Sequence, residues 1–286
     1  MPGAKCCRIP SRASGVRNSV RIVVCVKEVL DPDAVNNYAL AGHLEIGEDG
    51  KSLTQAAIPR LMNGFDEQAL EAALRLRDAG AECRIGVVSV GSDPAAILKH
   101  AAALGADEIA AVAQEEAFPD YHVVAALLAG YVRSSGGADL VLCGRQASDD
   151  DQGVVPALIC ESLGMPLVTN ACSVERVDAG FRITRVTPDG DEGVEVSGPV
   201  VVTVSNELGE PRYPTAAKKI AARRMKPEII TPQSLSLPDA ELQARVVAQR
   251  QFVPTVQGSC EFLQGETPGE LSEALVARLR QDGVIQ

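Results

Sequence analysis

The chain has 286 residues, of which 46% are apolar and only 3% are aromatic, with no tryptophan. An interior of Ala, Val, Leu and Ile is typical of a globular α/β protein whose sheet is covered by helices on both faces, and it disfavours an all-β sandwich. The net charge of −11 excludes nucleic acid and anionic membranes as default partners, because both require a positive surface.

Residues 1–20 carry four basic side chains and no acidic one. They lack the apolar core of a secretory signal, so we expect a basic, disordered extension, with a weak organelle-targeting segment as the alternative. The predicted location is the cytoplasm, or the mitochondrial matrix if this segment is a transit peptide. No stretch approaches the roughly 20 apolar residues of a membrane-spanning helix, so membrane insertion is not expected.

The eight cysteines include no C-x-x-C pair and no spacing typical of a zinc site or an iron–sulfur cluster. Cys25 and Cys143 fall in apolar runs, where a thiol acts as a small hydrophobe. We therefore expect a reducing compartment and no metal site.

Strand and helix patterns alternate between residues 21 and 163. Apolar runs predict buried strands at 21–29, 83–90, 108–113 and 140–143. Helical periodicity predicts helices at 66–78, 94–104, 121–133 and 156–163, the second of them capped by Ser92 or Asp93, and the polar passage up to residue 54 predicts a small hairpin or excursion. This alternation implies right-handed crossovers and an open, mostly parallel, doubly wound sheet.

After Gly164 the pattern changes to strands at 167–177, 181–186, 194–196 and 200–204, which predict a strand-rich extension of the sheet. From residue 207 prolines interrupt the chain, which then contains a basic helix-compatible piece and a last helix near 270–280. We expect three parts: the extension 1–20, an α/β nucleotide-binding-type domain at 21–206, and a segment at 207–286 that recognises partners and ends in an arm wrapped around another subunit.

Open α/β sheets bind ligands at the carboxyl ends of their strands, where the candidate loops are 27–31, 90–93 and 144–155. Gly144 permits close backbone approach, and a helix predicted to begin near Gln152 would point free amides at an anionic phosphate. The three carboxylates Asp149 to Asp151 support an equally weighted alternative, an acidic cap that satisfies the same amides.

The sequence contains no evident catalytic constellation. It lacks the G-x-G-x-x-G, G-x-x-x-x-G-K-[ST] and G-x-S-x-G motifs. His43, His100 and His122 are scattered, and no Ser or Cys has a recognisable partner nearby in the sequence. A carrier subunit is favoured over an enzyme.

Six short motifs resemble those of electron-transfer flavoprotein beta subunits and occur in the same order. They are Val24-Cys-Val-Lys27, Asn63-Gly-Phe-Asp-Glu67 with the helix that follows it, Val88-Ser-Val-Gly91, Ala102-Ala-Leu-Gly-Ala-Asp107, Gly144-Arg-Gln-Ala-Ser-Asp-Asp-Asp151 and Glu210-Pro-Arg-Tyr-Pro-Thr215. The resemblance runs from about residue 21 to 286 and implies an adenine-nucleotide α-hydrolase-like fold. It also implies a heterodimer with an alpha subunit that holds most of one FAD. The heterodimer would pass electrons from flavin dehydrogenases, such as acyl-CoA dehydrogenases, to a membrane quinone reductase. The beta subunit would bind AMP, or a second FAD as in electron-bifurcating members.

The resemblance also implies roles for individual residues. The nucleotide positions would be Cys25, Asn63, Val90, Gly91, Gly144, Gln146, Asp150, Gly153, Val154 and Val155, while Phe65 would approach the flavin of the alpha subunit. Members of the family often carry Gln and Thr where this chain has Val154 and Val155, so only backbone donors remain there for a phosphate. The partner-binding residues would be Thr215, Ala216, Lys218, Lys219, Arg223 and Arg224, with Ala216 in place of a leucine that anchors the partner dehydrogenase.

Two other functions fit the same predicted sheet. One is a stand-alone adenine-nucleotide-dependent transferase or ligase, although the S-G-G-x-D-S type of pyrophosphate loop is absent. The other is a nucleotide-sensing scaffold without a redox role, which fold analogy alone does not separate from a carrier.

Overall fold

The computed structural model describes residues 7–10, 19–54, 56–116, 119–178, 180–253 and 260–286. The chain forms two compact units, Met1–Gln251 and Phe252–Gln286. This division differs from the predicted boundary at 206/207, because residues 207–251 pack in the first unit. The expectations for residues 1–6 and 11–18 lie outside the described residues.

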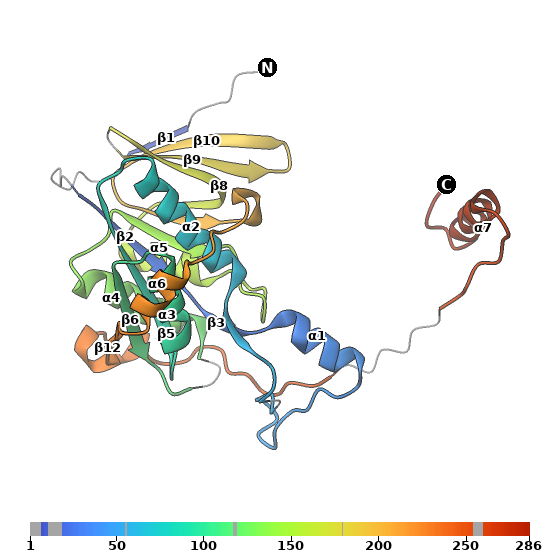
Figure 1. Cartoon of the computed structure of the whole chain (residues 1–286), viewed down its shortest axis with the longest axis horizontal. Coiled ribbons are helices and arrows are strands. Elements are labelled where there is room, and N and C mark those ends of the chain that lie inside the picture. The colour runs from blue at the N-terminus through green and yellow to red at the C-terminus, as the bar shows by residue number, and fades with distance from the viewer. Residues whose placement is uncertain (1–6, 11–18, 55, 117–118, 179, 254–259) are drawn as a thin grey trace. The chain divides into compact units, whose positions relative to one another are not determined.

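A ten-stranded sheet forms the centre of the first unit, in the order β1-β10-β9-β8-β11-β7-β2-β5-β6-β12 (Figure 1). Six neighbouring strands run parallel: β11 (Val200–Val204), β7 (Leu140–Gly144), β2 (Val20–Cys25), β5 (Cys83–Gly91), β6 (Glu108–Ala113) and β12 (Glu228–Ile230). Beyond β11, the strands β8 (Leu167–Val177), β9 (Gly180–Thr187) and β10 (Gly190–Ser197) form an antiparallel meander. The predicted open, mostly parallel α/β fold with a strand-rich extension is therefore confirmed.

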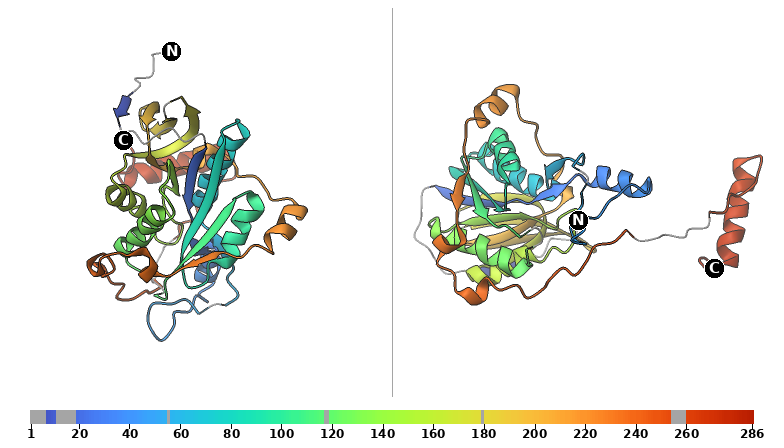
Figure 2. Two further views of the ribbon diagram at one scale, coloured as in Figure 1. Left: turned by 90° about the vertical axis from the view of Figure 1, so that its left-hand side faces the viewer. Right: turned by 90° about the horizontal axis from the view of Figure 1, so that it is seen from below.

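Helices cover both faces of the parallel strands. The helices α2 (Gly64–Asp78) and α3 (Ala95–Leu104) pack on one face, and α4 (Tyr121–Ser134) and α5 (Val155–Leu163) pack on the other. Within β2, Ile22 and Val24 contribute to the first layer and Val23 and Cys25 to the second, as the two-residue period of a strand requires. Figure 2 shows the two helical layers on either side of the sheet. The sheet is doubly wound, as predicted.

The expected single strand at 21–29 is wrong, because the chain leaves the sheet after Cys25. The strand β3 (Glu28–Leu30) pairs instead with β4 (Arg60–Met62) in a separate two-stranded sheet. The Lys27 amide donates to the side chain of Asp66 rather than to a neighbouring strand, so the ladder cannot continue. The polar passage after β3 holds a helix that the sequence pattern did not predict, α1 (Pro32–Leu40), whose N-cap Asp31 accepts from the amides of Asp33 and Ala34.

Other differences from the predicted elements concern their ends. The helix α3 begins after Pro94 with no capping side chain, although Asp93 accepts a hydrogen bond from the Ala95 amide at 3.4 Å. The helix α5 begins at Val155 rather than near Gln152. At the N-terminus, β1 (Cys7–Pro10) pairs in parallel with β10, so these four residues of the expected disordered extension are ordered by a neighbouring strand.

Residues 207–251 form the last part of the first unit. The short helix η1 (Asn206–Leu208) leads into this segment. It is followed by α6 (Ala216–Ala222), the edge strand β12, and the short helices η2 (Pro232–Leu235) and η3 (Asp239–Glu241). Ala222 and Leu235 are buried, which fixes this segment to the domain. The second unit contains α7 (Pro268–Gln281), capped by Thr267, close to the predicted helix at 270–280. No helix in the described parts of the chain is long and apolar enough to cross a membrane.

Candidate functional site

The candidate site lies where β2, β5, β7 and β11 end. The strands β5 and β6 lie on one side of β2, and β7 and β11 lie on the other side. The connection that leaves β2 therefore runs to one side of the sheet and the connection that leaves β7 runs to the other, which makes the gap between β2 and β7 a switch point. Such a switch point opens a crevice at the carboxyl ends of the strands. The loops that follow β2 and β7 carry Lys27 and residues 144–155, as the sequence predicted.

The Asp66 carboxylate joins these two loops. Its oxygens accept hydrogen bonds from the Lys27 amide at 2.8 Å and from the Gly144 amide at 2.9 Å. Asp66 is buried, and burial raises its pKa to about 7 even though the two amides and Asn63 favour the charged form. An acidic residue in the first turn of α2 thus holds together the ends of β2 and β7.

Asn63 fixes the loop after β7. Its side-chain amide donates to the carbonyl of Gln146 at 2.8 Å, and its side-chain oxygen accepts from the Ser148 amide at 3.2 Å. The residue is only 1% exposed, so both bonds are shielded from water. The Asn63-Gly-Phe-Asp-Glu67 stretch and the loop at 144–151 are therefore parts of one structure, although some 80 residues separate them.

Gly144 is required by the packing of helix α2. A Cβ atom at this position would lie 2.7 Å from the Cβ of Phe65 and would also collide with a carboxylate oxygen of Asp66. The packing reason stands beside the sequence-based interpretation, in which this glycine lets a ligand approach and which stays a prediction. The first turn of α2 occupies the space that a side chain would need.

The three consecutive carboxylates do not cap α5. Lys27 binds Asp149 at 2.7 Å and Asp150 at 3.1 Å, and Asp151 accepts from the side chain of Gln146 at 2.8 Å. Burial lowers the pKa of Lys27, but the hydrogen bonds and charges of Asp149 and Asp150 outweigh burial and raise it above its usual 10.5. Asp150 also accepts a hydrogen bond from the Gln152 amide at 3.2 Å, so the acidic-cap alternative holds for that one amide, whereas α5 itself begins at Val155 and has no side-chain cap.

The amino end of α5 is consequently open. Among the described residues, the main-chain amides of Gly153, Val154 and Val155 have no hydrogen-bond partner. Gly153 has a φ of +62°, and a Cβ there would lie 2.7 Å from the carbonyl oxygen of Arg145, so only glycine fits without strain. Free amides at the start of a helix bind anions such as phosphate.

The other sequence-predicted positions lie around the same edge. Cys25 ends β2, Cys143 is the last residue but one of the adjacent strand β7, and both are buried. The neighbouring Cys25 thiol together with burial raises the pKa of Cys143 well above its usual value. Val90 and Gly91 end β5 beside them. Phe65 is half-buried, and the guanidinium of Arg145 lies 4.8 Å from the centre of its ring.

The predicted partner-binding residues lie elsewhere, on and after α6, which packs against α3. Thr215 caps this helix by accepting from the Lys218 amide at 3.3 Å. Ala216 and the four cations Lys218, Lys219, Arg223 and Arg224 are exposed. They form a basic surface of their own and do not line the crevice.

Sequence reasoning missed several residues that build the site. Asp66 and Lys27 were not assigned roles, because their partners lie 39 to 123 residues away in the chain. Arg212 was also missed, and it anchors the segment before α6 to Glu71 of α2 at 2.7 Å. The described part of the chain contains no cluster of three His, Cys, Asp or Glu residues able to hold a metal ion. The crevice thus combines free amides at the start of a helix with an acidic loop whose charge Lys27 partly offsets.

Comparison with known proteins gives consistent matches. The family model described as electron transfer flavoprotein domain matches residues 52–230. The chain is 30% identical over 276 residues to the caffeyl-CoA reductase-Etf complex subunit CarD of Acetobacterium woodii, with 93% of this chain and all of that protein covered. It is 33% identical to the electron transfer flavoprotein subunit beta of Syntrophomonas wolfei, covering 73% and 78% of the two chains. It is 28% identical to the acryloyl-CoA reductase electron transfer subunit gamma of Anaerotignum propionicum, covering 93% and 100%.

Proposed function

Because the chain belongs to the electron transfer flavoprotein family, as a homologue of its beta subunits, we propose that it pairs with an alpha subunit that holds most of one FAD. The chain is an electron-transfer subunit. In the proposed heterodimer it carries electrons from a flavin dehydrogenase of the acyl-CoA dehydrogenase kind to a quinone reductase or another acceptor. Its own residues supply no catalytic step.

One observation carries the nucleotide part of this proposal: the unpartnered amides at the start of α5. They fit the phosphate of AMP, or the pyrophosphate of a second FAD. Val154 and Val155 add no side-chain donor, so phosphate binding would rest on backbone amides. Lys27 offsets part of the negative charge of Asp149 and Asp150, and this reduces their repulsion of the ligand.

The remaining predicted positions would contact the rest of the nucleotide. Cys25, Asn63, Val90, Gly91, Gly144, Gln146 and Asp150 lie in or beside the strand ends and loops that form the crevice. Phe65, with Arg145 on its ring, would face the flavin held by the alpha subunit. When bound, that FAD supplies the electron chemistry, and this chain positions and shields it.

We assign the second compact unit, residues 252–286, to the alpha-subunit interface. The exposed apolar side chains Phe252 (67%), Phe262 (81%) and Leu275 (47%) are unusual for a free surface and suit burial against another chain. The basic surface around α6 is assigned to the dehydrogenase partner. With Ala216 as a small anchor there, charge rather than apolar packing would guide that contact.

Co-expression with an alpha subunit tests the proposal. We expect a yellow heterodimer of 1:1 stoichiometry, and mass spectrometry of its released small molecules should identify FAD together with AMP or a second equivalent of FAD. A colourless, stable monomer would contradict the carrier role, as would nucleotide turnover by the isolated chain. Release of AMP without any flavin would favour a nucleotide-sensing scaffold instead.

A further inference from the structure

A second candidate site lies at the opposite edge of the sheet, where the parallel strands begin. Two adjoining cavities of about 260 and 270 Å³ open there, and both are lined by Glu108 at the start of β6, Tyr131 of α4 and Glu228 at the start of β12. This edge is remote from the crevice at the strand ends. No role has been assigned to it by the nucleotide and partner arguments above.

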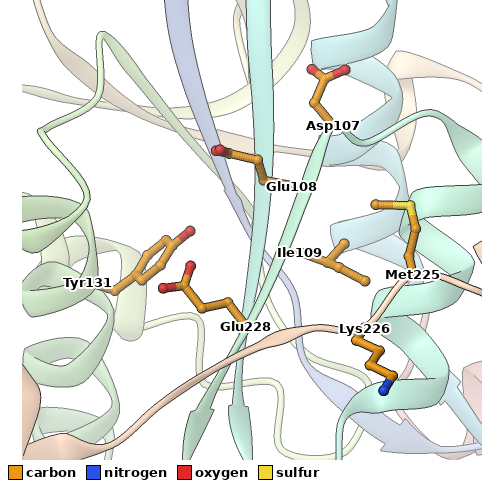
Figure 3. Close-up of a pocket in the computed structure, with 7 residues that line it drawn as sticks. All are labelled: Asp107, Glu108, Ile109, Tyr131, Met225, Lys226 and Glu228. Atoms are coloured by element: carbon orange, nitrogen blue, oxygen red, sulfur yellow. The ribbon is translucent and has the colours of Figure 1, made fainter.

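The three shared side chains converge on one space. Figure 3 shows the Tyr131 hydroxyl pointing from its helix toward the carboxylates of Glu108 and Glu228. Gly86 of β5 borders this space, because a Cβ at that position would be in ordinary van der Waals contact with Glu108 Oε2 at 3.7 Å and with the Tyr131 hydroxyl at 3.9 Å. The cavity is therefore walled by oxygen atoms that come from three different elements.

Two of these polar groups lack partners. Tyr131 is only 4% exposed, yet within the described residues its hydroxyl makes no hydrogen bond. Glu228 forms no ion pair in that same part of the chain, whereas Glu108 is paired with Arg84 and lies 3.9 Å from Arg21. The ammonium group of Lys226 points away from the three converging side chains (Figure 3). The Tyr131 hydroxyl opens onto the cavity and the exposed Glu228 carboxylate faces the same space, so both groups are accessible to a ligand.

The electrostatics of the cavity indicate the charge of that partner. Burial, and then the negative charge of Glu108, raise the pKa of Tyr131 to about 12; the charge of Arg21 lowers it, and that of Glu228 raises it. Tyr131 is therefore neutral at physiological pH and can accept a hydrogen bond while it donates one to a carboxylate. The space beside the unpaired Glu228 carboxylate and the Tyr131 hydroxyl suits a hydrogen-bond donor with a positive charge.

We propose that this cavity binds an organic cation, with an ammonium or guanidinium group that donates hydrogen bonds to the Glu228 carboxylate and to the Tyr131 hydroxyl oxygen. A volume of about 260 Å³ admits the charged end of an aliphatic amine or of a basic side chain. Charge-assisted hydrogen bonds to a carboxylate are the stronger kind, so Glu228 supplies most of the affinity. Neither the nucleotide site nor the redox role is needed for this inference.

Calorimetric titration of the full-length chain with agmatine, which carries both cationic groups, tests the proposal. We expect saturable 1:1 binding with a dissociation constant of about 1 mM or lower, and none with the neutral alcohol 1,4-butanediol. Glu228→Gln should weaken binding about tenfold and Tyr131→Phe about fivefold, because each removes one acceptor. Glu45→Gln, which removes an exposed carboxylate outside the cavity, is the matched control and should leave binding unchanged.

The same titration on the heterodimer distinguishes two sources of the cation. If the natural ligand is a free amine, agmatine binds the heterodimer as it binds the single chain. If the ligand is a basic side chain of the alpha subunit, agmatine no longer binds, and Glu228→Gln weakens the heterodimer. The absence of saturable agmatine binding to the wild-type chain would overturn the proposal, and so would undiminished binding to the Glu228→Gln variant.

Discussion

Arg212 binds the carboxylate of Glu71 through two guanidinium nitrogens, at 2.7 and 3.1 Å, across 141 residues of sequence. Glu71 is buried in α2, and Arg212 lies in the Glu210-Pro-Arg-Tyr-Pro-Thr215 stretch that leads into α6. The main-chain amide of Arg212 also donates to the Glu71 carboxylate, and its guanidinium forms a second ion pair, with Asp78 at 2.7 Å. The pair therefore fixes the segment that carries the basic surface to the helix whose first turn builds the crevice.

Replacing Arg212 by Met should destabilise the first unit by about 3 kcal/mol, because the buried Glu71 carboxylate loses its main partner. Urea unfolding followed by circular dichroism measures the change. The double variant Glu71→Gln/Arg212→Met should recover much of that loss, since no buried charge is left unpaired. Equal destabilisation by the single and double variants would contradict the importance of this pair.

The sequence predicted the parallel strands and their covering helices because each buried element is long and strongly patterned. It failed at elements that depend on distant partners. The strand β12 has three residues with Ile229 66% exposed, and it exists because β6 offers it an unpaired edge. The helix α1 has no buried residue, so no apolar stripe marked it.

The same limitation applied to the site. The sequence indicated the crevice and free amides at a helix start, but α5 begins at Val155 rather than near Gln152. Asp66 looked like an ordinary acid in a first helical turn, where it would interact with the helix dipole. Its bonds to the amides of Lys27 and Gly144 follow from the tertiary structure alone.

The buried Asp66 should make stability depend on pH between about 4 and 7. Its pKa rises from 3.8 to about 7 on folding, so in this window the native state holds a proton that the unfolded state releases. The free energy of unfolding should therefore fall as the pH rises, by roughly 4 kcal/mol across the full range. Urea midpoints measured from pH 4 to 8 give this slope.

Asp66→Asn should flatten that slope, because the titrating group is gone. It should also lower stability by about 1–3 kcal/mol at low pH, since the side-chain nitrogen cannot accept from one of the two buried amides. Asp189→Asn, in the exposed β9–β10 turn, should keep the wild-type slope. A wild-type slope in Asp66→Asn would show that other groups dominate this window.

Glu71 should also make the free energy of unfolding depend on pH, but at lower pH than Asp66 and with the opposite sign. Burial raises its pKa, but the bonds donated by Arg212 and Arg75 outweigh burial and hold the pKa below its usual 4.5. Its contribution to stability is thus fully present above about pH 4.5 and is lost as the pH falls through the lower folded value. The Glu71→Gln variant should therefore lose less stability than the wild type between pH 4.5 and pH 2, which acid titration followed by circular dichroism can measure.

Two glycines near the start of α2 offer a matched comparison. Gly144→Ala should cost about 2–4 kcal/mol or prevent folding, because the new methyl group collides with Phe65 and Asp66. Gly64→Ala has no atom within 4 Å of the new methyl group and should be neutral or stabilise by up to about 1 kcal/mol. Thermal unfolding of both variants measures the difference, and a Gly144→Ala protein as stable as Gly64→Ala would refute the packing role.

Lys27 should control how well the crevice accepts a phosphate. In Lys27→Met the carboxylates of Asp149 and Asp150 lose their compensating charge beside the free amides of α5, so AMP affinity should fall about tenfold. Asp149→Asn should change affinity in the opposite direction, because it removes one repelling charge and leaves Lys27 bound to Asp150. Lys99→Met, a half-buried lysine of α3 outside the crevice, is the control and should bind AMP as the wild type does. Calorimetric titration of nucleotide-stripped heterodimer measures all three, and equal AMP affinity in Lys27→Met and wild type would place the phosphate away from this loop.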